Sequence, residues 1–245
     1  MKDSLLVIYG INPVLEAIPT GAVVTLYMSG RNDARASEIL RLAATRGINV
    51  ERTGKATLTK MSGGGVHQGV VAKLNVAHEC LVTDLIDGTL SVPLLVVLDG
   101  IQDPQNFGAI LRTVDAVGAD GVIYQKRRAA PLSGVTARTS AGAIVHTKRA
   151  CVVNIVHALE ELKRAGIWTV GLAGGAPKRY DTIDLTQPTA FVVGAEGVGL
   201  RRLVRERCDW LVSIPMRGHV GSLNVSVATG VALFEAIRQR KSTTY

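Results

Sequence analysis

The amino-acid sequence predicts an α/β protein built around a parallel β-sheet. Short apolar runs without polar alternation, such as "LLVVLDG" (94–100), are typical of strands that are buried on both faces. These runs alternate with helical segments, and the clearest of them, 154–166, is amphipathic and ends at Gly166. Regular alternation of strand and helix favours parallel strands with helices packed on the sheet.

The N-terminal part of the chain predicts a smaller α/β domain. Strands are expected at 22–30, 48–53 and 68–76, and a helix at 33–47 that ends at Gly47. The segment 77–92 has weak periodicity and precedes Pro93, which indicates a linker. The predicted division is therefore a domain at 1–76, a linker at 77–92 and a larger domain at 93–245.

The larger domain contains the sharper patterns. After the strand at 94–100, Asp103 and Pro104 are typical of the N-cap and first turn of a helix. A further helix is expected at 133–144, and strands at 120–125, 167–175, 189–197 and 210–215. Because ligands of open α/β sheets bind beyond the carboxyl ends of strands, we expect a site formed by 171–175, 194–199 and 215–224.

Composition narrows the class of partner. The chain carries 28 Lys and Arg against 20 Asp and Glu, a net charge of +8, which favours a polyanion, with nucleic acid first and an anionic membrane second. Charge that serves only solubility is the alternative. The three cysteines lie far apart and form no C-x-x-C pair, which argues against zinc and against a disulfide framework. The chain has no apolar run long enough to span a membrane, so a soluble cytoplasmic protein is expected.

Two glycine-rich turns, 171–176 and 194–200, follow apolar strands. Glycine allows a backbone to approach a ligand closely, although a tight turn alone also explains it. The glycine order differs from the G-x-G-x-x-G of dinucleotide folds, and "SGGGVHQG" (62–69) lacks the Lys-Ser/Thr ending of a phosphate-binding loop. Both NAD and ATP are therefore disfavoured.

The last helix contains unexpected polar residues. The stretch from Val220 to Phe234 is uncharged, yet it includes Ser222, Asn224, Ser226 and Thr229, whose buried polar atoms would need partners. Ser226 and Thr229 are expected to bond carbonyls of their own helix. A glycine at position 230 favours the close approach of a neighbouring backbone or helix.

Asn106 and Arg112 present a geometric problem. Six residues separate them, which corresponds to roughly 120° around a helix. Either Asn106 belongs to the loop before the helix, or the two side chains serve surfaces that face different ways, as on a helix that straddles a subunit interface.

Three ordered stretches carry a family resemblance. "LDGIQDPQNFGAILRTVDAVG", "VVGAEGVGL" and "IPMRGHVGSLNVSVATGVALFEAIRQ" resemble the motifs of the SpoU (TrmH-type) branch of the SPOUT RNA methyltransferases, and the similarity extends to "YGINPVLEAI" and "GVHQGVVAKL". The resemblance implies a parallel sheet with a C-terminal deep trefoil knot, preceded by a small L30e-like domain. It also implies a homodimer that uses S-adenosyl-L-methionine and no metal to methylate the ribose 2′-oxygen of a guanosine in 23S ribosomal RNA.

The resemblance assigns residues as well. It places Arg112, Asn106, Glu196, Ser222 and Asn224 in the catalytic site. It places Gly194, Ile214 and Leu223 at the cofactor, and the loop residues Ala173 and Gly174 are expected beside them. Because a guanidinium stays protonated in proteins, we interpret Arg112 as an electrostatic stabiliser and leave the general base unassigned.

Basic residues and loops suggest where RNA binds. The candidates for RNA contact are Arg31, His67, Arg127, Arg128, Arg201 and Arg217. Two alternatives stay open on the sequence alone: a methyltransferase that acts on transfer RNA, and a non-catalytic RNA-binding factor in ribosome assembly.

Overall fold

The computed structural model describes residues 5–75, 79–88, 92–127, 129–130 and 132–242. The chain divides into two compact units. Unit 1 comprises 1–78 and 131–146, and unit 2 comprises 79–130 and 147–245. The segment 131–146 thus clusters with the N-terminal residues, whereas the sequence placed it in the larger domain.

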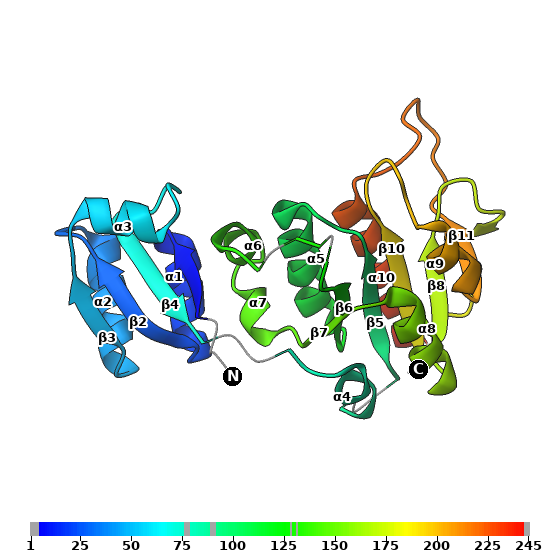
Figure 1. The fold of residues 1–245 in the computed structure, drawn as a ribbon, viewed down its shortest axis with the longest axis horizontal. Helices are drawn as coiled ribbons and strands as arrows, with labels where there is room; N and C mark the ends of the chain where they lie inside the picture. Colours follow the sequence, from blue (N-terminus) through cyan, green and yellow to red (C-terminus); the bar gives the residue numbers. More distant parts are fainter. Residues whose placement is uncertain (1–4, 76–78, 89–91, 128, 131, 243–245) are drawn as a thin grey trace. The chain divides into compact units, whose positions relative to one another are not determined.

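Unit 1 is built on a mixed sheet (Figure 1). In the described part of the chain its strand order is β1-β4-β2-β3, with β4 antiparallel to β1 and β2, and β3 parallel to β2. The strands are β1 (Leu6–Tyr9), β2 (Val23–Met28), β3 (Asn49–Arg52) and β4 (Val70–Leu74). The helices are α1 (Ile11–Ala17), the 3₁₀ turn η1 (Ile18–Thr20), α2 (Ala34–Thr45), α3 (Lys55–Met61), α6 (Gly134–Thr139) and α7 (Ala143–His146).

The expected strands and the expected helix of unit 1 are confirmed, and Asp33 caps α2 by accepting from the backbone N–H of Ala36. The single helix expected at 133–144 is wrong. Two consecutive residues in the left-handed region, Ala141 with φ +48° and Gly142 with φ +82°, interrupt it and separate α6 from α7.

Unit 2 contains the predicted parallel sheet. Within the described residues its strand order is β7-β6-β5-β10-β8-β11-β9, and neighbouring strands pair in parallel. The strands are β5 (Leu94–Asp99), β6 (Gly121–Gln125), β7 (Arg149–Val152), β8 (Trp168–Leu172), β9 (Lys178–Arg179), β10 (Thr189–Gly194) and β11 (Trp210–Ser213). The helices are α4 (Val82–Asp87), α5 (Pro104–Val117), α8 (Ile155–Arg164), α9 (Arg202–Arg207) and α10 (Val225–Ser242).

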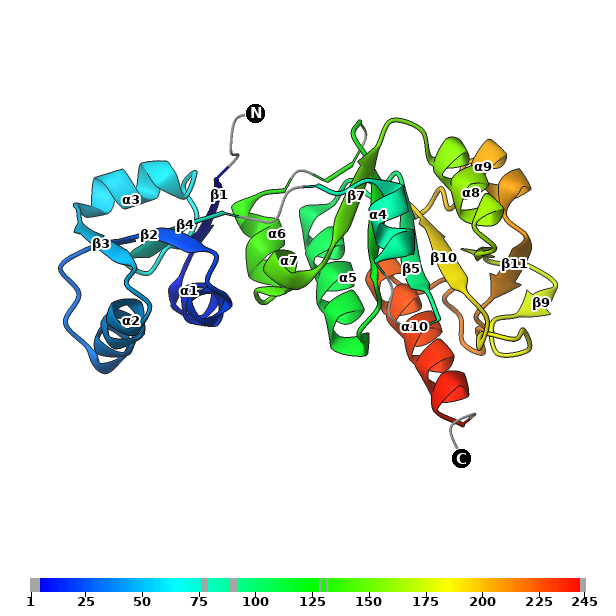
Figure 2. The ribbon, with the colours of Figure 1, turned by 90° about the horizontal axis from the view of Figure 1, so that it is seen from below.

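Helices cover both faces of this sheet (Figure 2). On one face, α4, α8 and α9 bury alternate residues of β5 and β10, and the cluster includes Leu95, Val97 and Val192. On the other face, α5 and α10 pack against each other and α10 packs on β10. Because side chains of a strand alternate between its faces, both sides of β5 and β10 are apolar, as the uninterrupted apolar runs predict.

The segment expected to be a linker is partly a structural element of unit 2. Helix α4 lies within 77–92, and its Leu85 is fully buried in the core cluster of unit 2. The six residues of α4 are too few to show a helical period clearly, which explains why the hydrophobic periodicity of this segment is weak. Within the residues that the structure describes, no helix is both long enough and apolar enough to cross a membrane.

The strand order positions the site. From β5 the chain moves outward through β6 and β7, and β8 then lies on the opposite side of β5, with β10 inserted between them. Such a reversal leaves a crevice beyond the carboxyl ends of the strands. The loops that follow β8, β10 and β11 all project from this edge of the sheet (Figure 1).

Candidate functional site

A pocket of about 590 Å³ lies at the carboxyl ends of β8, β10 and β11. All three stretches that the sequence singled out, 171–175, 194–199 and 215–224, contribute residues to its wall. Its lining residues are Leu172, Ala173, Gly174, Val193, Gly194, Ala195, Glu196, Gly197, Val198, Gly199, Leu200, Arg205, Val212, Ile214, Met216, Gly221, Ser222, Leu223, Asn224, Val225 and Ala228. The volume falls within the range of small-molecule sites.

The loop after β10 folds back on its own strand. The backbone N–H of Gly199 donates to the carbonyl of Ala195 at 2.8 Å, and Gly197 and Gly199 both have positive φ. A Cβ on Gly194 would overlap the backbone of Gly199, so this position requires glycine. The loop therefore presents a backbone wall to the pocket, with Glu196 as its carboxylate.

A buried carboxylate anchors the far end of this loop. Asp99, the last residue of β5, is buried and accepts from the backbone N–H of Arg201 at 2.8 Å and from its Nε at 2.6 Å. The Arg201 guanidinium, predicted to contact RNA, is thus held by Asp99. Asp99 was not among the residues predicted from the sequence, although an acidic residue at the end of a wholly apolar strand indicates a specific role.

Asn224 joins the three motifs. Its side-chain oxygen accepts from the backbone N–H of Ser226 at 2.9 Å and of Val227 at 3.4 Å, which caps α10. Its side-chain nitrogen donates to Oδ1 of Asn106 at 2.9 Å and to Oε1 of Glu196. Since both ends of the amide are engaged, its orientation is fixed, and it holds α5, α10 and the loop after β10 together.

The other polar residues of the last helix have local partners. Thr229 donates to the carbonyl of Val225 at 2.7 Å, which confirms the expected bond to its own helix. Ser226 instead donates to the side-chain oxygen of Asn224 at 2.5 Å. The helix begins at Val225, so Ser222 lies before it rather than in its first turn. Gly230 faces Thr113 of α5 at a distance that would accommodate a Cβ, so packing within the chain does not require glycine there.

Asn106 and Arg112 face different ways. Asn106 belongs to α5 and is buried against Asn224, whereas Arg112 is exposed and does not line the pocket. The spacing left two interpretations open. The structure shows the one in which the two side chains belong to different surfaces. The structure brings together Asn106, Glu196, Ser222 and Asn224 but leaves Arg112 outside this group.

None of the candidate RNA contacts that the structure describes is among the residues that line the pocket. Arg31 pairs with Asp33 and donates to the carbonyl of Gln68 at 2.9 Å. His67 accepts at Nδ1 from the backbone N–H of Gly69 at 3.0 Å, and its Nε2 atom lies 3.2 Å from the Thr59 hydroxyl. Arg127 and Arg217 are exposed. Arg128 lies outside the described residues.

The pocket fits the cofactor that the family resemblance implies. The five residues expected at the cofactor, Ala173, Gly174, Gly194, Ile214 and Leu223, all line it. The glycine positions expose backbone groups, and the remaining wall is largely aliphatic, as an adenosyl group requires. Arg205 and Met216 also line the pocket, and sequence reasoning missed them as cofactor neighbours. Among the described residues no group of three or more metal-ligating side chains is present.

Family models match both units. Residues 93–234 match the SpoU rRNA Methylase family, and residues 7–79 match the model described as RNA 2′-O ribose methyltransferase substrate binding. A 23S rRNA (guanosine-2′-O-)-methyltransferase from Haemophilus influenzae is 43% identical over 98% of this chain and 99% of its own length. The protein of the same name from Pseudomonas putida is 43% identical over 96% of each chain.

Solved structures show the same architecture. The SpoU methyltransferase AviRb from Streptomyces viridochromogenes, in complex with the cofactor AdoMet, has a TM-score of 0.79 and 30% sequence identity. The similarity covers 97% of this chain and 91% of that one. Matching motifs, full-length relatives and a shared fold lead to one conclusion: the chain belongs to the SpoU rRNA Methylase family.

Proposed function

We propose that this chain transfers a methyl group from S-adenosyl-L-methionine to the ribose 2′-oxygen of a guanosine in 23S ribosomal RNA. The observation that carries the proposal is the junction at Asn224, which binds the buried Asn106 and holds Glu196 at the wall of a pocket built from strand-end loops. Full-length similarity to enzymes named for this reaction supports the substrate.

The cofactor supplies an electrophilic methyl group on a sulfonium. The chain holds it with the backbone of the loop after β10 at Gly194, the loop after β8 at Ala173 and Gly174, and the segment after β11 at Ile214 and Leu223. Glycine at position 194 lets the loop backbone form this wall, because the Cβ of any other residue would overlap the backbone of Gly199.

The accepting hydroxyl meets the polar rim of the same pocket. Among the described residues, the Asn224 side chain and the backbone N–H of Val225 donate to Glu196, and both hydrogen bonds end on Oε1. The Oε2 atom is left to accept from a ribose hydroxyl, and the Ser222 hydroxyl lies on the same rim. Asn224, whose side chain also donates to Asn106, holds this carboxylate in one orientation, which lowers the cost of arranging the acceptor.

A second copy of the chain completes the site. The outward face of α10 exposes Val227 by 50% and Phe234 by 57%, and α5, which packs beside it, exposes Arg112. We propose that these helices form a homodimer interface and that Arg112 reaches the partner's pocket. There its permanent positive charge stabilises the negative charge that forms on the 2′-oxygen.

The finer architecture belongs to the same proposal. The loops after β8, β10 and β11 meet in one pocket, and α10 returns across the sheet to α5, which supports a deep trefoil knot in this region. The match of residues 7–79 to a substrate-binding model supports an L30e-like RNA-binding domain within 1–76, and the match of 93–234 supports a methyltransferase domain within 93–245. A cytoplasmic location follows from a ribosomal RNA substrate.

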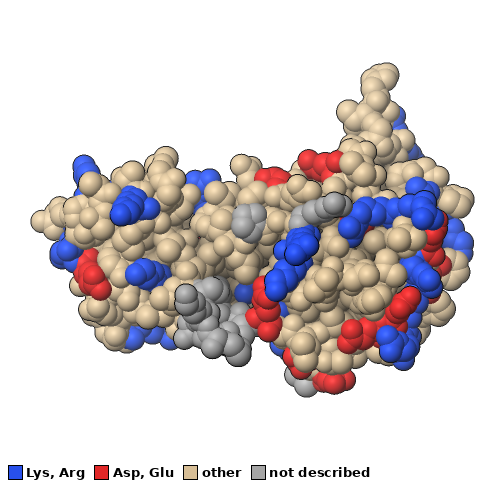
Figure 3. All heavy atoms as spheres, in the orientation of Figure 1, with Lys and Arg blue, Asp and Glu red and all other residues tan. Residues whose placement is uncertain are grey.

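Exposed cations supply the electrostatic grip on RNA. Arg127 and Arg217 are exposed, and on the face shown in Figure 3 lysine and arginine side chains form a broken band over unit 2. The net charge of +8 favours phosphate contacts, whose strength falls as salt rises.

Transfer of a tritiated methyl group tests the proposal. The protein is incubated with labelled S-adenosyl-L-methionine and either 23S ribosomal RNA or transfer RNA from a strain that lacks the enzyme, and the labelled nucleoside is identified. The expected product is 2′-O-methylguanosine in 23S RNA. Label in transfer RNA would instead establish the other substrate, and binding of both ligands without transfer would establish a non-catalytic factor.

A further inference from the structure

Both tryptophans of the chain lie at the end of the unit 2 sheet opposite the cofactor pocket. Trp168 is the first residue of β8 and Trp210 the first residue of β11, whereas the cofactor pocket lies beyond the last residues of these strands. Their ring centroids are 6.2 Å apart, and Trp168 is 47% exposed. Tryptophan is mostly buried in proteins, so the exposed Trp168 ring beside the half-buried Trp210 indicates a surface that binds a ligand or a partner.

The rings border a second cavity. Its volume is about 350 Å³, and its walls come from the first residues of β8, β10 and β11 and from the chain between β9 and β10. The lining residues are Trp168, Val170, Lys178, Thr182, Ile183, Asp184, Gln187, Thr189 and Trp210. The size suits one nucleotide or one amino-acid side chain rather than an extended protein segment.

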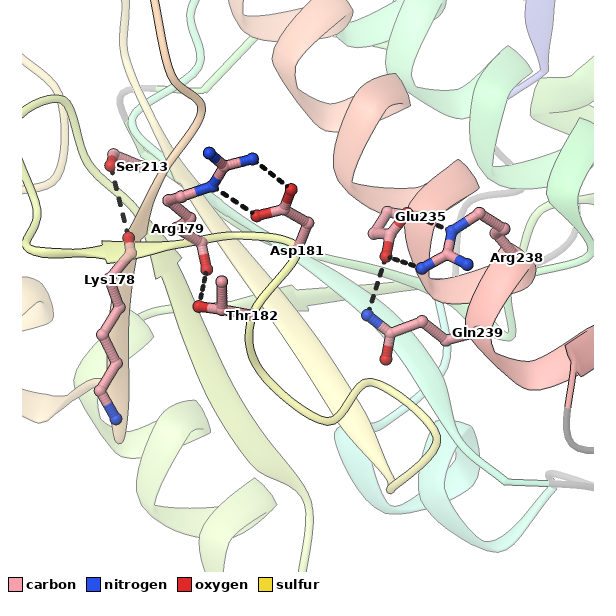
Figure 4. Close-up of polar contacts among 8 residues, drawn as sticks. All are labelled: Lys178, Arg179, Asp181, Thr182, Ser213, Glu235, Arg238 and Gln239. Atoms are coloured by element: carbon pink, nitrogen blue, oxygen red, sulfur yellow. Dashed lines mark hydrogen bonds and ion pairs between the residues drawn. The ribbon is translucent and has the colours of Figure 1, made fainter.

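A lysine places positive charge over this cavity. The two residues of β9 point to opposite sides: Arg179 turns toward Asp181, and Lys178 extends the other way (Figure 4). The Lys178 Nζ atom lies 3.4 Å from the centroid of the Trp210 ring. Lys178 has no ion pair with a carboxylate among the described residues, so its ammonium is available to an anion as well as to the ring.

The carboxylate of the cavity is already engaged. Asp184 Oδ1 accepts from the backbone N–H and the hydroxyl of Thr186, and Oδ2 accepts from the Gln187 amide nitrogen at 3.3 Å. The Gln187 side-chain oxygen accepts no hydrogen bond from the described residues and can accept one from a base edge. The cavity thus combines an exposed indole face, an ammonium and an amide acceptor.

We propose that this cavity binds one unpaired base of the RNA substrate, several nucleotides from the methylated one. The base stacks on Trp168, the adjoining phosphate meets Lys178, and Gln187 contacts the base edge. Proteins that read single-stranded RNA use aromatic faces and nearby cations in this combination, since every base offers a flat π-surface. The inference rests on the proposed RNA substrate and adds a subsite to it.

The tryptophans themselves report on the site. Because the chain has no others, quenching of its intrinsic fluorescence by a mixed-sequence, single-stranded octaribonucleotide measures stacking in this cavity. Binding is measured in parallel by the anisotropy of the same RNA carrying a fluorescent label. We expect quenching to saturate with the anisotropy signal, and to persist in Trp210→Phe but not in Trp168→Phe.

Affinity variants test the energetic role. Trp168→Ala is expected to weaken RNA binding about fivefold to a hundredfold, while Trp168→Phe retains most of the affinity. Lys178→Glu is expected to weaken binding and to reduce its salt dependence. Val153→Ala is the matched control, because Val153 is 84% exposed on unit 2 and lies outside this cavity. Melting temperatures confirm that each variant is folded, and calorimetry should give unchanged affinity for S-adenosyl-L-methionine.

Several outcomes would overturn the proposal. If Trp168→Ala and Lys178→Glu both methylate 23S RNA with the wild-type KM, the subsite is rejected and the proposed function is unaffected. A change in oligomeric state in Trp168→Ala, without loss of RNA affinity, would show a contact between copies instead. Absence of methyl transfer by the wild-type protein would reject the proposed function, and the subsite with it.

Discussion

The Asn224 side chain uses its oxygen to cap α10 and its nitrogen to hold Asn106 and Glu196. One amide therefore performs a structural task and a positioning task at once. An aspartate in its place retains acceptor oxygens for the cap but cannot donate. The two tasks can accordingly be separated by substitution.

Asn224→Asp and Asn224→Ala should differ in stability but share a loss of activity. The aspartate keeps the cap, whereas alanine loses it and should destabilise the protein by about 0.5–2 kcal/mol in urea unfolding. Both remove the side-chain donor to Glu196, so methyl transfer should fall about a hundredfold in each. Wild-type turnover in Asn224→Asp would show that the hydrogen bond to Glu196 has no role in the reaction.

Gly194→Ala tests the backbone wall of the cofactor pocket. The new Cβ would overlap Gly199, so the loop must shift, and we expect affinity for S-adenosyl-L-methionine to fall about tenfold to a hundredfold in calorimetry. Gly218→Ala is the control, since a Cβ there meets nothing within 4 Å and Gly218 lies outside the pocket lining. Equal affinities in the two variants would contradict this assignment.

One carboxylate links the strands β8 and β11 to the helix α8. Asp209 accepts from the backbone N–H of Thr169 at 2.9 Å and from its hydroxyl at 2.6 Å, and it pairs with Lys163 of α8 at 2.8 Å. Burial of Asp209 acts to raise its pKa, but the hydrogen bonds from Lys163 and Thr169 outweigh burial and leave the pKa below its ordinary value of 3.8.

A lowered pKa means that this contribution to stability is complete above about pH 4 and is lost as the pH falls through the folded-state pKa. Asp209→Asn should therefore destabilise the protein by about 1–3 kcal/mol at pH 7, measured by urea unfolding. The difference between variant and wild type should shrink below pH 3. A difference that is independent of pH would show that shape, not charge, sets the effect.

Strong local signals made most elements predictable from sequence. The N-cap Asp103, the helices expected at 33–47 and 154–166, and the apolar runs of β5 and β10 all appear in the structure. The sequence analysis did not identify several short elements, namely the strands β1, β7 and β9 and the helices α1, α3, α4 and α9, none of which is longer than seven residues. The break between α6 and α7, also missed, depends on a left-handed alanine. Local periodicity does not encode such features.

The site was predictable to a similar degree. Glycines and polar residues at three strand ends indicated where it lies, and the family resemblance indicated which residues to expect. Hydrogen-bond partners were not predictable, because Asn224 and Asn106 are 118 residues apart in sequence. Arg201 shows the limit of a charge pattern, since its guanidinium is held by Asp99.

In the proposed homodimer, Arg112 reaches the pocket of the partner subunit. If Arg112 acts on the partner's pocket, two inactive variants should complement each other. Mixing Arg112→Ala with Asn224→Asp in equal amounts, after dissociation and reassociation, should restore about a quarter of wild-type methyl transfer. Random reassociation makes about half of the dimers heterodimers, and each heterodimer has one intact site out of two. Each variant alone is the control, and a mixture no more active than its components would place Arg112 in its own chain's site.

The decisive measurement concerns the atom that receives the methyl group. Once the modified guanosine is mapped, the same RNA fragment is prepared with 2′-deoxyguanosine at that position and compared with the all-ribose fragment in the tritium-transfer assay. We expect the deoxy fragment to bind with similar affinity and to accept no label. Label retained at that nucleotide in the deoxy fragment would show that the base is the acceptor, and would contradict a site built to methylate a ribose oxygen.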